Sequence, residues 1–262
     1  MSANASGQLQ LVQEKGWKRG LGNLLQGEYS AWFRSSRWWK HFILWFVIVN
    51  VMMIIMIIAN DPPLLLMYGI FGGMFVAIGV MIIMQQVLVR EKNSGTAAWV
   101  LSKPVTRTAF VVSRLVVNSI AILLTAVIVP GVVLYITLGL SIDLGWLPPL
   151  GFTAALVMIS LNMFYWIALV LMMGTLSDSA SVVIAIPITL FFTFAYGPGL
   201  IPPLIYISPL MLAFNLSDRI IPLTVSFISG EPVFSWLPLI STAVFSVIFI
   251  AVAIWRFNRQ EF

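Results

Sequence analysis

The chain has 262 residues, of which 60% are hydrophobic and only 9% are charged, and its formal net charge is +5 at pH 7. A soluble domain usually carries about 25% charged residues, so this composition excludes an ordinary soluble domain and favours a protein that is solvated by the lipid bilayer. With no cysteine and a single histidine, the chain cannot form a disulfide framework, and we expect neither a metal site nor catalytic residues in it.

The first predicted element, at residues 17–40, follows a polar N-terminal tail at residues 1–16. Apolar side chains recur in it at helical spacing, and charged and amide side chains fall mainly on the other face. This pattern predicts an amphipathic helix in the membrane interface, with tryptophan and leucine facing the lipid. It leaves open whether the helix is a plain anchor or an elbow that moves with a cytoplasmic partner. The defining residues are Trp17, Leu21, Leu24, Leu25, Glu28 and Trp32.

The remaining residues, 41–262, are predicted to form one domain of six transmembrane helices, which makes the fold class an all-α integral membrane protein. Most of the apolar runs reach the ~20 residues that a span requires. The fifth run is the shortest, because Pro187 lies inside it and a Gly-Pro-Gly sequence follows it. The predicted spans are at about residues 42–59, 64–89, 115–140, 150–176, 182–196 and 237–255.

The segment at residues 197–236, between the fifth and sixth spans, is too apolar for a solvated loop, yet prolines divide it too often for a full span. Irregular backbone at membrane depth is tolerated only where protein buries it. The segment therefore predicts short re-entrant helices that dip into the outer leaflet. A seventh span is the alternative.

Lysine and arginine are placed on one side of the predicted membrane. Thirteen of the fourteen basic residues fall before the first span, around the loop after the second span, or in the C-terminal tail, and Arg219 is the exception. Because basic residues mark the cytoplasmic side, both termini are predicted to be cytoplasmic in a cell inner membrane. Anionic lipid headgroups account for this charge, so we expect no nucleic-acid partner.

Polar side chains within the spans are few. Gly69 and Gly73 form a GxxxG pattern, which favours close helix packing but is weak evidence for a dimer. No acidic residue falls at mid-membrane depth in these spans, which disfavours an ion-coupled carrier. The asparagines are either interhelical hydrogen-bonding residues or contacts along a substrate path. These candidates are Asn50, Asn118 and Asn162.

The loop at residues 90–107 begins polar and becomes a short apolar helix that Pro104 ends. Its sequence, Glu91-Lys-Asn-Ser-Gly-Thr followed by Leu101-Ser-Lys-Pro-Val-Thr-Arg107, resembles the "E-x-x-x-G-T … L-S-x-P-V-S-R" pattern of ABC-2 type transporter permeases. The segment that begins Asn23-Leu-Leu-Gln-Gly-Glu-Tyr resembles their N-terminal connecting helix. Lys103 departs from that pattern, since small or polar residues are common there in relatives.

This resemblance implies a dimer of two permease subunits, identical or paralogous, each docked on a separate cytoplasmic ABC ATPase subunit. ATP and Mg²⁺ would then be held by the ATPase partner, in agreement with the absence of a P-loop sequence from this chain. The resemblance further implies that the loop couples ATP hydrolysis to export by alternating access. The docking residues it implies are Glu91, Gly95, Thr96, Leu101, Pro104, Val105 and Arg107.

Two other functions remain open at this point. The first is an assembly or mechanical-work subunit that an ABC ATPase drives without transport, and the second, which is disfavoured, is an ion-coupled carrier. The many Met, Phe and Trp residues would suit a lipophilic or amphiphilic cargo, but they would equally suit lipid-facing surfaces.

Overall fold

The computed structural model describes residues 2–3, 9–10, 15–59, 64–140, 146–216 and 220–260. Six helical stretches in these ranges are long and apolar enough to cross a membrane, as the sequence predicted. The only strands in them are the two-residue β1 (Ser2–Ala3) and β2 (Leu9–Gln10), which pair antiparallel. Arg219 and most of the predicted polar tail lie outside the described residues.

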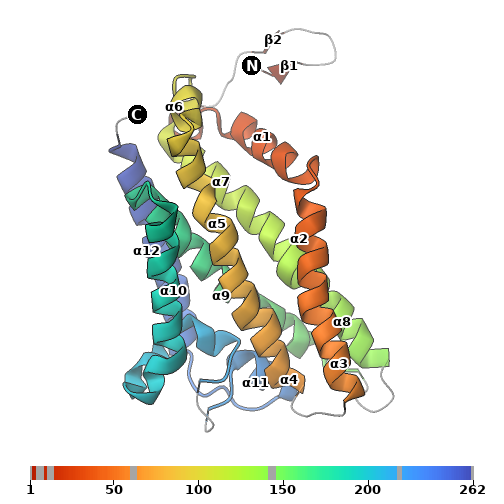
Figure 1. Cartoon of the computed structure of the whole chain (residues 1–262). Coiled ribbons are helices and arrows are strands. Elements are labelled where there is room, and N and C mark those ends of the chain that lie inside the picture. The colour runs from red at the N-terminus through yellow and green to blue at the C-terminus, as the bar shows by residue number, and fades with distance from the viewer. Residues whose placement is uncertain are drawn as a thin grey trace.

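The N-terminal segment forms the short 3-10 helix η1 (Gly16–Lys18) and then α1 (Leu21–Phe33). Instead of continuing to residue 40, the helix ends at Phe33, and α2 begins at Arg37. The Ser35 hydroxyl donates to the carbonyl oxygens of Ala31 and Trp32, at 2.6 and 3.1 Å. A serine side chain bonded in this way competes with the backbone N–H groups that would otherwise bind these carbonyl oxygens and continue the helix. As a result α1 lies obliquely across one end of the bundle (Figure 1).

Each of the first three spans is one unbroken helix in which a stretch of π-helix lies between two stretches of α-helix. A π-helix is rare in proteins and is usually only a single turn long. The first span consists of α2 (Arg37–Phe46), η2 (Val47–Val51) and α3 (Met52–Ile58). The second consists of α4 (Leu64–Tyr68), η3 (Gly69–Phe75) and α5 (Val76–Asn93). The third consists of α7 (Arg107–Ile122), η4 (Leu123–Ile128) and α8 (Val129–Leu140).

The last three spans are α9 (Pro149–Leu176), α10 (Ala180–Tyr196) and α12 (Leu237–Asn258). Buried residues make up 67% of the most apolar part of α9, against 22% for α10 and α12. A helix that is apolar on all sides belongs inside a bundle, and α9 is the central helix, in contact with α5 and α12. It also contacts the segment between α10 and α12, which we call the outer segment after its predicted position. The faces of the peripheral helices that remain exposed are apolar.

Both termini and the short helix α6 (Thr96–Leu101) lie at the same end of the bundle, which we call the α6 end (Figure 1). The third span has 34 residues, or about 50 Å at 1.5 Å per residue, while the hydrocarbon core of a bilayer is only ~30 Å thick. Arg107 and Arg114 lie at its α6 end. The helix therefore extends beyond the hydrocarbon at that end.

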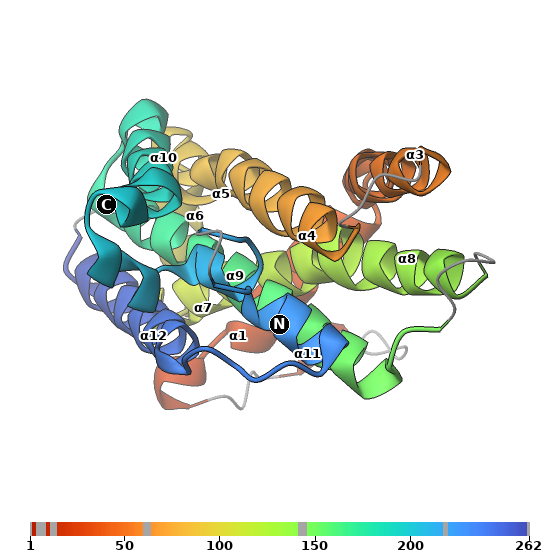
Figure 2. The same cartoon turned by 90° about the horizontal axis from the view of Figure 1, so that it is seen from below.

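The opposite end carries the segment between α10 and α12, which forms η5 (Gly197–Gly199), η6 (Pro202–Tyr206), η7 (Pro209–Leu212) and α11 (Leu223–Ser229). Of these, η7 and α11 contact α9, η6 and η7 contact α12, and η5 contacts α10. They lie at the end of the bundle that faces the viewer in Figure 2. Short helices rather than a seventh span were predicted here, and the fold agrees.

The GxxxG pattern of the second span packs within the chain. A Cβ atom added to Gly69 would overlap the carbonyl oxygen of Ala213, and one added to Gly73 would lie 2.6 Å from the Ala213 Cβ. Because Gly69 and Gly73 have no side chains, the buried stretch after η7 can approach the second span closely. The pattern thus serves to hold the outer segment.

Candidate functional site

The helix α6 forms the tip of the loop between the second and third spans. Gly95 precedes it with φ of +72°, a left-handed conformation that glycine adopts without a steric penalty. Ala97 is fully buried against the bundle, while Trp99 on the other face has 61% of its surface exposed. The Lys103 ammonium lies 3.4 Å from the centroid of the Trp99 ring. A large aromatic side chain in this position is typical of a protein contact surface.

The predicted docking residues fall into two groups. Gly95, Thr96 and Pro104 are exposed next to Trp99, and Leu101 is half-buried against the core. The other three hold the loop in place: Glu91 pairs with Arg114, Val105 packs against Gly20, and Arg107 donates to the Asn258 carbonyl oxygen at 2.7 Å. Trp99 was not among the predicted residues, although a tryptophan in a short polar-flanked helix is a signal that could have identified it.

The base of the loop is bonded to the segment before α1. The Thr106 hydroxyl donates to the Trp17 carbonyl oxygen at 2.5 Å, and the Thr106 N–H donates to the Arg19 carbonyl oxygen at 3.1 Å. The Trp17 ring is half exposed. The start of the predicted elbow and the end of the predicted coupling loop therefore form one connected unit.

A partly buried ion-pair network joins three elements at the α6 end. The Arg114 side chain on α7 is 7% exposed, and its Nε and Nη2 bind the two Glu91 carboxylate oxygens of α5, each at 2.9 Å. Its Nη1 also pairs with the Glu28 carboxylate of α1. Two parallel N–H···O bonds fix both the distance and the orientation of a guanidinium and a carboxylate. The network, which we call the Arg114 triad, therefore holds α1 and α5 to α7.

Asn118 lies one turn further along α7 and extends this network. Its Oδ1 accepts a hydrogen bond from the Trp32 indole at 2.7 Å, and its Nδ2 donates to the Arg114 carbonyl oxygen at 2.7 Å. Trp32 and Asn118 are both buried. Both amide atoms of this predicted substrate-path residue are thus bonded within the chain, where they fasten α1 to the third span.

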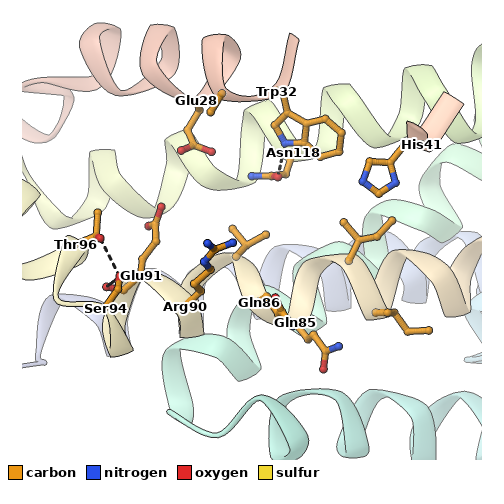
Figure 3. A pocket seen from close by; sticks show the side chains of 14 residues that line it. Glu28, Trp32, His41, Gln85, Gln86, Arg90, Glu91, Ser94, Thr96 and Asn118 are labelled. Carbon is orange, nitrogen blue, oxygen red and sulfur yellow. Dashed lines mark hydrogen bonds between the residues drawn. The ribbon is translucent and has the colours of Figure 1, made fainter. Parts of the chain in front are cut away.

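A cavity of about 660 Å³ opens beside the Arg114 triad (Figure 3). Its walls come from α1, α2, α5 and the start of α6, and Asn118 of α7 also contributes. Glu28, Glu91, Ser94 and Thr96 lie toward one end, and His41 lies at the other (Figure 3). The apolar part of the lining includes Ala31, Trp32, Ile82, Ile83 and Val87.

The sequence profile of ABC-2 family transporter proteins matches residues 48–262. The chain belongs to this family. No curated protein matches the sequence closely enough to be a recognised relative. Membership makes this ABC-2 protein a membrane component of an ABC transporter, a permease and not itself a catalytic subunit. The match includes α6 and Arg114 and leaves out α1.

The other two predicted substrate-path residues of this ABC-2 protein, Asn50 and Asn162, are buried in the spans. Asn162 accepts a hydrogen bond from the Trp166 indole at 3.0 Å, and its Nδ2 has no partner among the described residues. Neither amide atom of Asn50, in the π-helical stretch η2, has a partner there. Within the described ranges, no group of three or more His, Cys, Asp or Glu side chains could hold a metal ion.

Lys92 ties a second loop to the α6 end of this permease. Its ammonium donates to the carbonyl oxygens of Gly174 and Ser177, at 3.0 and 3.3 Å, and pairs with the Asp178 carboxylate at 2.5 Å. A cation at the C-terminal end of a helix is favourable because the carbonyl groups there carry partial negative charge. Lys92 thereby fixes the turn between α9 and α10 to the end of α5.

Proposed function

We propose that this chain is the permease subunit of an ATP-binding cassette exporter. Two permease subunits, identical or paralogous, would each dock on a cytoplasmic ABC ATPase that holds ATP and Mg²⁺. ATP binding and hydrolysis would move the docked loops and switch the permease between inward-open and outward-open states, because the ATP-bound partner favours one state over the other.

The observation that carries this proposal is the combination of an exposed tip and a fixed base in the loop around α6. Trp99 projects from the tip, with Gly95, Thr96 and Pro104 exposed beside it. The base is held to α5, α7 and α12 through Glu91, Arg114 and Arg107. A movement of the tip would therefore also move the second, third and sixth spans, because the base of the loop is bonded to all three.

The same contacts support a mechanical role for α1. Glu28 joins it to the Arg114 triad, and Trp32 joins it to Asn118. An anchor that only rested on the lipid would need no buried contacts of this kind. We infer that α1 is an elbow helix that moves together with the docked loop.

The distribution of charge supports an inner-membrane protein with the α6 end in the cytoplasm. Twelve lysine and arginine residues with described side chains lie at or near that end: Lys15, Lys18, Arg19, Arg34, Lys40, Arg90, Lys92, Lys103, Arg107, Arg114, Arg256 and Arg259. Positive charge of this kind marks the cytoplasmic side. Both termini would then be cytoplasmic, and membrane lipids would cover the exposed apolar faces of the spans.

The exposed aromatic tip gives a direct prediction. Replacing Trp99 with alanine should weaken ATPase docking by about 2 kcal/mol, or some thirtyfold, because interface tryptophans are often the residues that contribute most. Insertion and thermal stability should change little, since the side chain is exposed in the isolated chain. The measurement is recovery of the ATPase with the tagged permease, with the exposed Trp255→Ala on α12 as the matched control. Equal recovery with Trp99→Ala and Trp255→Ala would contradict docking through α6.

The proposal as a whole is tested by gentle detergent extraction of the tagged chain from its native membrane, followed by mass spectrometry of the proteins recovered with it. We expect a P-loop ATPase in near-equal amount. Stimulation of its ATP hydrolysis by a small amphiphile would support export over mechanical work. A chain that comes repeatedly alone under mild conditions would overturn the proposal.

A further inference from the structure

We propose that the ATPase subunit contacts a second element of this chain besides α6, namely η1 and the residues on either side of it, and that the ATPase surface bound there is acidic. The inference rests on the proposed function and adds to it a docking element and the chemistry of the partner surface. We call the exposed residues 15–19 and 102–104, together with Trp99, the basic aromatic surface.

Two pairs of side chains in this surface have the same form. The Trp17 ring is 51% exposed, and the Lys18 ammonium lies 5.5 Å from its centroid. Trp99 and Lys103 form the corresponding pair in the loop around α6. A cation next to an exposed aromatic ring presents apolar area and positive charge side by side. Each pair therefore suits a partner whose apolar contact site is bordered by carboxylates.

The backbone fixes the two parts of the surface to each other. Gly20 has a φ of +80°, and a Cβ atom at this position would overlap the Val105 Cγ1 atom. Val105 thus packs directly on the backbone between η1 and α1. The two hydrogen bonds that Thr106 donates to the carbonyl oxygens of Trp17 and Arg19 complete this contact. A single partner can therefore contact η1 and α6 at the same time.

The bilayer does not reach this surface. The second span has 30 residues, which is about 45 Å at 1.5 Å per residue and about 42 Å across the bilayer at the average tilt of about 20°. It begins with the apolar run Leu64–Tyr68, so its outer end lies within the hydrocarbon, which is ~30 Å thick. Asn93 at the other end therefore lies about 12 Å beyond the hydrocarbon, past a headgroup layer of ~5–8 Å.

The helix η1 lies at least as far from the bilayer as the end of this span. Arg114 of α7 pairs with Glu91, close to that end, and Thr106 lies eight residues before Arg114, about 12 Å along the helix. This part of α7 leads toward the α6 end, where α6 and the start of α1 both lie (Figure 1). Since Thr106 is bonded to η1, lipid headgroups do not account for the exposed ring of Trp17. We therefore assign Trp17 to a protein partner instead of the lipid that the sequence predicted.

The charge of the surface determines which partner it favours. Its four cations are exposed, and none of them pairs with a carboxylate in the described part of the chain: Lys15, Lys18, Arg19 and Lys103. A basic partner surface would be repelled, and an acidic one would be attracted and oriented. The exposed tryptophans add the apolar contacts that hold a partner once it has bound.

The test is carbodiimide cross-linking of the complex extracted in mild detergent from its native membrane. This reagent joins a lysine amine directly to a carboxylate without a spacer, and mass spectrometry identifies the two residues. We expect links from Lys18 and Lys103 to aspartate or glutamate residues of the ATPase. Lys40, an exposed lysine at the start of the first span, is the internal control and should form none.

Charge variants test the acidic partner through its affinity. The double variant Lys15→Glu, Lys18→Glu should lower the affinity of the purified permease for the ATPase about tenfold at low salt and by less at high salt. The double variant Lys15→Arg, Lys18→Arg should bind like the parent, because it keeps both charges. The matched control is Lys40→Glu, Arg259→Glu, which changes the net charge equally away from the surface and should also bind like the parent.

Three results would overturn the inference and leave the proposed function standing. The first is parent-like affinity of the Lys15→Glu, Lys18→Glu variant for the recovered ATPase. The second is a set of links in which only Lys103 joins the ATPase, while Lys18 joins a second copy of the permease or no protein. The third is weaker binding of the same variant to phosphatidylglycerol vesicles with unchanged ATPase affinity, which would assign the surface to lipid. A preparation without any ATPase would refute the proposed function and this inference together.

Discussion

Replacing Arg114 with glutamine is expected to destabilise the protein by about 3–5 kcal/mol, because the change removes the buried guanidinium that pairs with two partly buried carboxylates, those of Glu28 and Glu91. The guanidinium is 7% exposed and is the partner of both carboxylates in the described ion pairs. We expect the midpoint of thermal unfolding in detergent to fall by about 10 °C, as measured by fluorescence-detected size-exclusion chromatography of the heated protein. A parent-like midpoint would contradict the structural role of the triad.

A neutral version of the triad separates stability from coupling. The triple variant Glu28→Gln, Glu91→Gln, Arg114→Met removes all three charges together, and such replacements are often neutral for stability. We expect it to regain most of the lost stability but to couple ATP hydrolysis poorly, because α1, α5 and α7 are no longer held in a fixed orientation. Parent-like coupling in a stable triple variant would contradict a role of the triad in coupling.

Replacing Gly69 with alanine is expected to cost about 1–3 kcal/mol by overpacking, at the upper end of this range because the new Cβ would overlap a backbone carbonyl oxygen, that of Ala213. The outer segment would have to move away from the second span. Thermal unfolding in detergent measures the effect. Gly27→Ala is the matched control, since nothing lies within 4 Å of the new Cβ and alanine favours the helix.

A double variant tests which atom causes the effect. Gly73→Ala would place its Cβ 2.6 Å from the Ala213 Cβ, so adding Ala213→Gly should restore stability. The same second change should not rescue Gly69→Ala, because the carbonyl oxygen remains. Rescue of both variants, or of neither, would contradict the described packing of the outer segment.

The six spans were predictable because bilayer thickness alone demands long apolar helices. The start of the third span, at Arg107 instead of about residue 115, was not predictable. The sequence gives no sign that α7 continues past Arg114 to Arg107, because a charged residue normally marks the end of a span, and here two distant carboxylates neutralise it. The end of α1 at Phe33 was also missed, since it depends on the local hydrogen bonds of Ser35.

The candidate docking loop was recognisable from its motif, but the direction of each side chain was not. Glu91 and Arg107 look like exposed charges in the sequence, yet their partners are 23 and 151 residues away in the chain. The GxxxG pattern likewise predicts close packing without naming the partner, which is the stretch around Ala213. Long-range contacts of this kind decide which motif residues face outward, and these contacts cannot be read from a single sequence.

The central claim, that α6 docks on a cytoplasmic ATPase, is tested most directly by site-specific cross-linking. The chain has no cysteine, so Ser102→Cys at the exposed end of α6 introduces its only thiol, and Ser229→Cys at the exposed end of α11 is the matched control. Membranes of each variant are treated with a heterobifunctional thiol-to-amine reagent of short span, and the products are identified by mass spectrometry. We predict a cross-link from residue 102 to a P-loop ATPase and none from residue 229. No ATPase adduct at residue 102, in membranes from which the ATPase is recovered with the permease, would contradict docking through α6.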